Sequence, residues 1–233
     1  EEMVSNLYAS TITRQFREVK ELMYSTLSWG DEEMALLAQT LEAVACPKLV
    51  GFYAKYNRIG DAGCTALAKA IAARTYPKLE DLDLQRNQIG DGGCTALAEA
   101  CAAGALPNLD QLELSSNQIG DGGCTALAKA CAVGALPNLT ALDLSSNKIS
   151  DGSCTALAEA FAAGALPELF ELNLGTNQIG DGGCTSLAKA CATGALPKLK
   201  TLWLPSNKIG EDCITSLGYA WVLEGKAADR LYM

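Results

Sequence analysis

Hydrophobic residues recur along this chain in a pattern that repeats every thirty residues. The clearest copy begins at Pro107 and reads PNLDQLELSSNQIGDGGCTALAKACAVGAL. The asparagine of the pattern keeps the same spacing throughout: Asn57, Asn87, Asn117, Asn147, Asn177 and Asn207. Self-similarity at a fixed period of this length is typical of a solenoid, in which each unit packs only on its neighbours.

Each copy predicts a short strand followed by a helix. Leu112 and Leu114 alternate with polar residues, which is the period of a strand with one buried face. The asparagine that follows is expected in a turn, where its side chain can bond local backbone groups. The sequence GDGG then predicts a second turn, with Asp121 as the N-cap of a helix that ends before Gly134. Four residues fall on one face of that helix: Cys124, Leu127, Ala128 and Cys131.

Because a helix joins each strand to the next, successive strands must run parallel. Strands stack at about 4.8 Å, whereas packed helices need about 8–10 Å. A stack of such units must therefore curve. The predicted fold is an α/β solenoid, a horseshoe with parallel strands on the concave side and helices on the convex side.

The motif LxxLxLxxNxI, seen between Leu109 and Ile119 and in nearly every other copy, resembles that of the leucine-rich repeat family. The long repeat with a full helix is similar to the ribonuclease-inhibitor-like subclass. The resemblance covers about residues 19–222 and is specific for the fold. It does not select one function, because that subclass includes inhibitors, immune-receptor sensor domains, a Ran GTPase-activating protein and structural scaffolds.

The repeats define a single domain with atypical ends, as is usual for a solenoid. Residues 1–18 do not match the repeat and are predicted to form an N-terminal cap. Residues 19–225 contain about seven repeats, of which the first has Leu27 in place of the asparagine. After Gly225 the pattern is lost, and residues 226–233 form either a C-terminal cap or the point where a longer chain was cut.

The net charge of −9 narrows the class of partner. A negative surface disfavours nucleic acid and anionic membranes and favours a protein partner with a basic surface. No apolar run approaches the roughly 18–20 residues of a membrane span. No sequence feature implies a cofactor.

The ten cysteines are predicted to be buried free thiols. Neighbours in a column should lie about one helix spacing apart, near 10 Å, whereas a disulfide needs Cα atoms within about 7 Å. Zinc binding is not expected, because the chain has no CxxC motif and no histidine. Many free thiols favour a reducing intracellular compartment, first the cytoplasm, with an organelle stroma or the nucleus left open. The columns consist of Cys64, Cys94, Cys124, Cys154 and Cys184, and of Cys101, Cys131 and Cys191.

Function is expected where the copies differ, at the outward positions of the strands. An acidic stripe with an aromatic residue toward each end is predicted there as a groove for a basic protein segment. The alternative is that these acids only keep an open sheet from pairing with other chains. The predicted partner-binding residues are Tyr53, Asp81, Asp83, Glu113, Asp143, Glu171 and Trp203.

No catalytic residues are predicted. Without histidine, Ser/His and Cys/His chemistry is impossible, and no pocket is evident beside the paired carboxylates of Asp83 and Glu113. The GDGG turns lack the lysine of a phosphate-binding loop and the carboxylates of a calcium loop. The predicted function is a non-catalytic interaction module or scaffold. Two alternatives stay open: a structural subunit of a large multiprotein assembly, and a GTPase-activating protein of the Ran-regulator type that would use Arg58 or Arg86.

Overall fold

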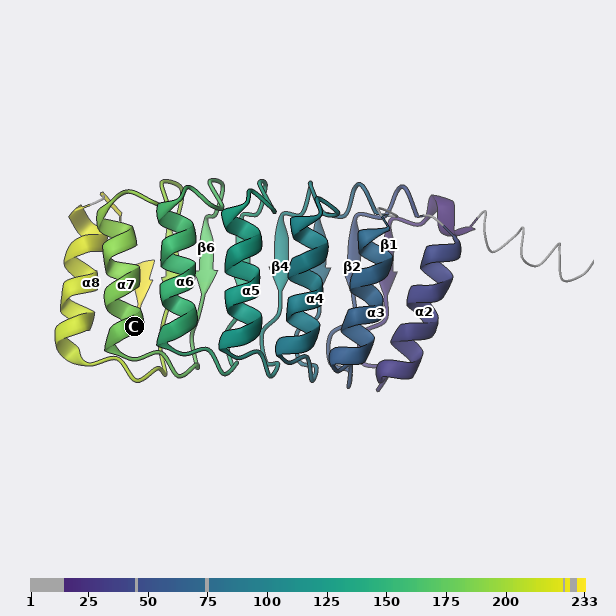
Figure 1. Ribbon diagram of the computed structural model, residues 1–233, viewed down its shortest axis with the longest axis horizontal. Coiled ribbons are helices and arrows are strands. Elements are labelled where there is room, and N and C mark those ends of the chain that lie inside the picture. The colour runs from purple at the N-terminus through teal and green to yellow at the C-terminus, as the bar shows by residue number, and fades with distance from the viewer. Residues whose placement is uncertain (1–14, 45, 74–75, 224, 227–229) are drawn as a thin grey trace, which may run out of the picture.

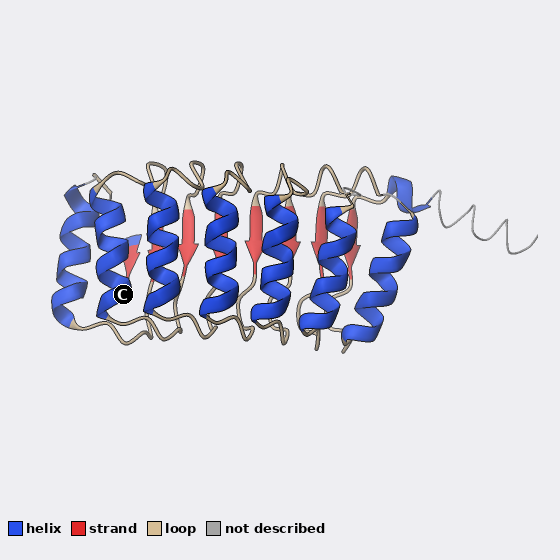
Figure 2. Ribbon diagram, in the orientation of Figure 1, coloured by secondary structure: helices blue, strands red, loops and turns tan. Residues whose placement is uncertain are grey.

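The computed structural model describes residues 15–44, 46–73, 76–223, 225–226 and 230–233. The described chain forms an elongated stack in which the units follow one another in sequence order (Figure 1). One layer of helices covers one face of a parallel sheet, and the loops run along the two edges (Figure 2).

The eight strands form a single sheet in the order of the sequence. The strands are β1 (Glu21–Met23), β2 (Gly51–Tyr53), β3 (Asp81–Asp83), β4 (Gln111–Glu113), β5 (Ala141–Asp143), β6 (Glu171–Asn173), β7 (Thr201–Trp203) and β8 (Leu231–Tyr232). The helices are α2 (Asp31–Ala43), α3 (Asp61–Ala72), α4 (Asp91–Ala102), α5 (Asp121–Ala132), α6 (Asp151–Ala162), α7 (Asp181–Ala192) and α8 (Glu211–Leu223).

Every strand pairs in parallel with the next, and from β1 to β7 the partners are thirty residues apart, as between Leu112 and Leu142. The central residue of each strand from β1 to β7 is buried against the helices, while its neighbours point to the other face. The predicted α/β solenoid is therefore confirmed.

The core lies between the sheet and the helices and is filled mainly by leucine and alanine, with cysteine next. All ten cysteines are free; nine are buried and Cys213 is half-buried. Burial raises the pKa of the Cys124 thiol to about 12, so it stays protonated and packs as a small apolar group. In the last helix Trp221 is fully buried, whereas Ile214 is only partly so.

A ladder of asparagines joins the repeats, as Asn117 illustrates. Its Nδ2 donates to the carbonyl oxygen of Leu114 at 3.1 Å and to that of Leu84, one repeat earlier, at 3.0 Å. Its Oδ1 accepts the Ile89 amide at 3.0 Å. The predicted bonds to local backbone are confirmed, and the same side chain also ties its repeat to the preceding one.

The prediction that Asp121 caps its own helix is wrong. Gly120 is the N-cap of α5, and it makes no side-chain cap because glycine has no side chain. The carboxylate of Asp121 instead accepts the amide of Ser150 at the start of α6, at 2.9 Å. The cap is therefore supplied by the preceding repeat, and this arrangement recurs from α3 to α8.

This transferred cap explains the glycines that follow each aspartate. A Cβ on Gly123 would lie 2.8 Å from the Cβ of Cys94 and 3.1 Å from the Cα of Asp91. Glycine therefore lets these consecutive helix starts approach this closely without moving a neighbour. In α6 the third position is Ser153, whose hydroxyl instead bonds Asp121.

Helix α2, the first helix of the repeats, supplies its own N-terminal cap. The Gly30 amide donates to the Glu33 carboxylate at 2.8 Å, at a position where later helices have glycine, serine or cysteine. Of the predicted N-terminal cap, residues 1–14 lie outside the described residues. Residues 15–18 are helical, and Phe16 packs against the core.

The segment 226–233, predicted as a C-terminal cap or a point of truncation, contains one more short strand. Leu231 and Tyr232 form β8 and pair with β7. Leu231 and Met233 pack against the core. Trp203 pairs with Tyr232, so the spacing is one residue shorter here and the strand does not follow the strict thirty-residue period.

Candidate functional site

The seven predicted binding residues all lie on strands β2 to β7 and point away from the core leucines. The parallel register aligns their third positions into one row across the sheet. The row reads Tyr53, Asp83, Glu113, Asp143, Asn173, Trp203 and Tyr232, so three carboxylates stand between aromatic residues. Asp81 and Glu171 lie in the neighbouring row, at the first positions of β3 and β6.

The β2 and β3 end of the acidic stripe is internally paired. The Tyr53 hydroxyl donates to Asp81 Oδ2 at 3.1 Å. Burial, and then the Asp81 carboxylate, raise the pKa of Tyr53 to about 12. Asp83 is only 6% exposed and forms an ion pair with Lys55 at 3.2 Å. The Asp83 carboxylate is therefore paired within the protein and is not available to bind a partner.

At the centre of the stripe, the carboxyl of Glu113 lies close to those of Asp143 and Glu171 and is only partly ionised near pH 7. Burial, and then repulsion from Asp143 and Asp83, raise the pKa of Glu113 to about 7. Among the described residues, no lysine or arginine forms an ion pair with Glu113, Asp143 or Glu171. Asp143 accepts only hydrogen bonds within the sheet, including one from Asn173 Nδ2 at 3.2 Å. A cation at this point would relieve the repulsion.

A hollow of about 230 Å³ opens on the sheet face beside these carboxylates. Its polar lining consists of Glu113, Asp143, Glu171 and Asn173, and Trp203 closes one side. The structure thus brings four of the seven predicted residues to one concavity. Tyr53, Asp81 and Asp83 do not line it.

Tyr232 is the residue of the site that the sequence interpretation missed. Its ring stacks on Trp203 with centroids 3.7 Å apart and planes inclined by 6°. Trp203 is 37% exposed and Tyr232 is 38% exposed. The available signal was the segment Leu231–Met233, which matches the alternation of Leu202–Leu204 one residue out of period.

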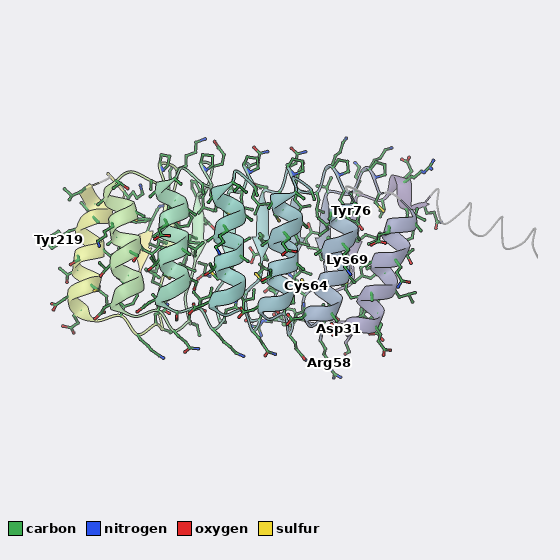
Figure 3. All side chains as sticks on the ribbon, viewed as in Figure 1. Asp31, Arg58, Cys64, Lys69, Tyr76 and Tyr219 are labelled. Carbon is green, nitrogen blue, oxygen red and sulfur yellow. The ribbon has the colours of Figure 1, made fainter. Side chains whose placement is uncertain are left out.

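The two arginines considered for a GTPase regulator occupy the loops at the edge of the sheet. The guanidinium of Arg86 lies 4.9 Å from the centre of the Tyr56 ring. Arg58 is exposed and projects from the loop edge (Figure 3). The two side chains have different surroundings and do not form a common site.

The helical face carries two grooves, of about 600 and 300 Å³. Grooves lie between α2 and α3 and between α6 and α7, lined mainly by alanine and threonine with a few charged residues. In the part of the chain that the structure describes, no group of three or more His, Cys, Asp or Glu side chains could hold a metal ion. No described helix is long and apolar enough to cross a membrane.

The fold and its asparagine ladder define a class of repeat solenoid, and comparison with known proteins identifies the repeat. The sequence model of the family described as Leucine Rich repeat matches residues 55–68, 77–98, 105–128, 135–158 and 169–188. The protein is therefore a leucine-rich repeat protein, and this fold is typically a protein-interaction module.

One solved structure of similar shape is the LRR ectodomain of the plant membrane receptor kinase GASSHO1/SCHENGEN3 from Arabidopsis thaliana, in complex with CASPARIAN STRIP INTEGRITY FACTOR 2. The sequence identity is 18% and the TM-score is 0.48. The match covers 87% of the present chain and 20% of that ectodomain, so the chain spans about a fifth of its length. Comparison with curated proteins gave no match.

Proposed function

We propose that this protein is a non-catalytic interaction module whose concave sheet face binds a protein partner with a basic surface. The observation that carries the proposal is the cluster of Glu113, Asp143 and Glu171, which form no ion pair with the described residues, on a face that also presents Trp203. Complementary charge accelerates encounter, and an exposed tryptophan in a concave surface is a typical binding hot spot.

Not all of the acidic residues on the sheet face are equally available to bind a partner. Asp83 is paired with Lys55, and Asp81 accepts the Tyr53 hydroxyl, so these two contribute mainly to the sheet itself. We expect partner affinity to depend on the acids that line the hollow. The 12-residue helices of the central repeats also support a place in the ribonuclease-inhibitor-like subclass. The buried free cysteines support a reducing intracellular compartment.

The test is capture of partners from a native extract, with identification by mass spectrometry. The variant carries Glu113→Lys and Glu171→Lys. The matched control carries Glu99→Lys and Glu159→Lys, the same charge change on exposed positions of α4 and α6. We expect a basic partner that is retained by the wild type and the control and lost from the variant. Retention of every partner by the variant would refute binding through the sheet face.

A structural subunit of a larger assembly is the second candidate. It is favoured by the exposed apolar side chains of α8, where Tyr219 is 71%, Val222 is 54% and Leu223 is 82% exposed. Tyr219 projects from α8 at the end of the solenoid (Figure 3). In that case Val222→Glu with Leu223→Glu should release the partners, and the charge reversals on the sheet should not. A GTPase-activating role has weaker support, because Arg86 already lies over Tyr56.

A further inference from the structure

The hollow on the sheet face has the chemistry of a site for one cationic side chain. Its polar groups are three carboxylates and one amide, and none of the residues that line it is basic. Asn173 is uncharged and cannot neutralise the carboxylates. Its Nδ2 donates to Asp143, and its Oδ1 accepts the Gly175 amide at 3.1 Å. The hollow therefore gathers three carboxyl groups on the sheet face without a basic residue in its lining.

Trp203 gives this hollow an aromatic wall. One face of its indole is covered by Tyr232 on β8. The other residues of the hollow come from β4, β5 and β6, so the second face of the indole is the one left to the hollow. A tryptophan face is the strongest aromatic partner for a cation, and the stack on Tyr232 holds the ring in place.

The volume of the hollow and the placement of its carboxylates favour one kind of cation. A volume of about 230 Å³ corresponds to about eight water molecules, enough for one side chain but not for a helix. The described residues offer no metal-binding group there. Asp143 and Glu171 are diagonal neighbours on adjacent strands, since Asp143 pairs with Asn173 and Glu171 with Ala141, and diagonal neighbours lie about 7–8 Å apart. A planar guanidinium can stack on an indole while its N–H groups reach carboxylates at its edge, whereas an ammonium is a point charge.

We propose that the hollow receives the side chain of one arginine of the partner, with the guanidinium stacked on Trp203 and bonded to Asp143 and Glu171. This inference rests on the proposed function, because it names the group that the sheet face recognises. Glu113 contributes negative charge from the far side of the hollow. The partner is then a protein that presents an exposed arginine on a protruding segment.

The test uses N-acetyl-arginine amide as the probe and NMR of the tryptophan indole N–H signals as the readout. The chain has three tryptophans, and the signal of Trp203 is the one that Trp203→Phe removes. We expect the arginine probe to shift that signal saturably and to leave the signal of the buried Trp221 unchanged. N-acetyl-citrulline amide, which is neutral and of nearly the same shape, should cause no saturable shift.

Two variants locate the binding. Glu171→Gln should weaken binding of the arginine probe by about three- to tenfold, and Glu99→Gln on the helical face should leave it unchanged. An unaltered Trp221 signal shows in each sample that the core is folded. Equal binding of the citrulline probe, equal binding of N-acetyl-lysine amide, or no saturable shift would each overturn the assignment to arginine.

The outcomes separate this inference from the proposed function. If the probe fails but charge reversal on the sheet still releases the partner, only the arginine site is wrong. If the probe binds at Trp203 and partner capture is insensitive to charge reversal, the hollow binds a guanidinium but the proposed function is wrong.

Discussion

The carboxylate of Asp91 accepts the backbone amide of Gly120 at 2.7 Å, although the two residues belong to different repeats. The same Oδ1 accepts the Gly123 amide at 2.9 Å. Each aspartate of this series thus stabilises the start of the next helix rather than its own. The helices are coupled along the stack by these caps on one edge and by the asparagines beside the sheet.

Loss of this cap should weaken the contact between two repeats. We expect Asp91→Ala to lower the free energy of unfolding by about 1–2 kcal/mol, measured by chemical denaturation. Amide exchange should accelerate at Gly120 and Gly123 and not at Gly60. The control Asp91→Asn keeps an acceptor oxygen and should retain most of the stability. Faster exchange at the start of α4 itself, with none at α5, would contradict the transferred cap.

Substitution of a buried asparagine of the ladder should destabilise the protein more than substitution of an exposed asparagine. Asn117 is 8% exposed, and its side chain satisfies the backbone groups of Ile89, Leu84 and Leu114. Because Asn117→Ala would leave these groups without a partner, we expect a loss of about 3 kcal/mol or more.

The matched control is Asn138→Ala. Asn138 also bonds a carbonyl of the preceding repeat, that of Pro107 at 2.8 Å, but the bond is exposed to solvent. Its loss should cost about 0.5 kcal/mol or less. Equal effects of the two substitutions in thermal and chemical denaturation would show that burial of the ladder is not what stabilises the stack.

The residue before each asparagine adopts a left-handed backbone conformation, with φ of 54° at Ser116. A β-branched side chain is disfavoured there, although the β-branched Thr176 adopts the same conformation before Asn177, with φ of 55°. We expect Ser116→Val to lower the free energy of unfolding by about 1–3 kcal/mol and Ser116→Gly to leave it equal or slightly raised. The comparison is made by chemical denaturation of both variants. A valine variant as stable as the glycine variant would mean that the turn relaxes.

Glu113 should make stability depend on pH near neutrality. Its folded pKa of about 7 lies above the ordinary value of 4.5, so between these values the native state holds a proton that the unfolded chain has lost. The contribution of Glu113 to stability is therefore full below about pH 4.5 and is lost as the pH rises to about 7.

Replacement of the Glu113 carboxylate tests the direction of this pH dependence of stability. We expect Glu113→Gln to be more stable than the wild type at pH 8 and about equal to it at pH 4.5. The gain at pH 8 should be about 1 kcal/mol, less than the full shift of the pKa implies, because the side chain is partly exposed and screened by solvent. A gain at pH 4.5 as large as that at pH 8 would exclude charge repulsion as the cause. Glu99→Gln serves as the control at both pH values.

The sequence by itself determined the fold, because the thirty-residue period fixes each strand, turn and helix through local patterning. Leu112 and Leu114 show a strand period, and Cys124 and Leu127 a helical one. Such patterns encode which side of each element is buried. They also sufficed to place the acidic residues on the open face of the sheet, since alternate residues of a strand point to opposite faces.

The tertiary structure decided which partner each polar group takes. Asp121 has the sequence position of an N-cap, but its carboxylate reaches the next repeat because the helices stack with their starts in contact. Asp83 and Glu113 hold equivalent positions in the sequence repeat, yet of the two only Asp83 forms an ion pair with Lys55. Tyr232 belongs to the site because it pairs with Trp203 at a spacing one residue shorter than the repeat, and its ring stacks on that of Trp203. These relationships depend on distances between repeats, which no local pattern encodes.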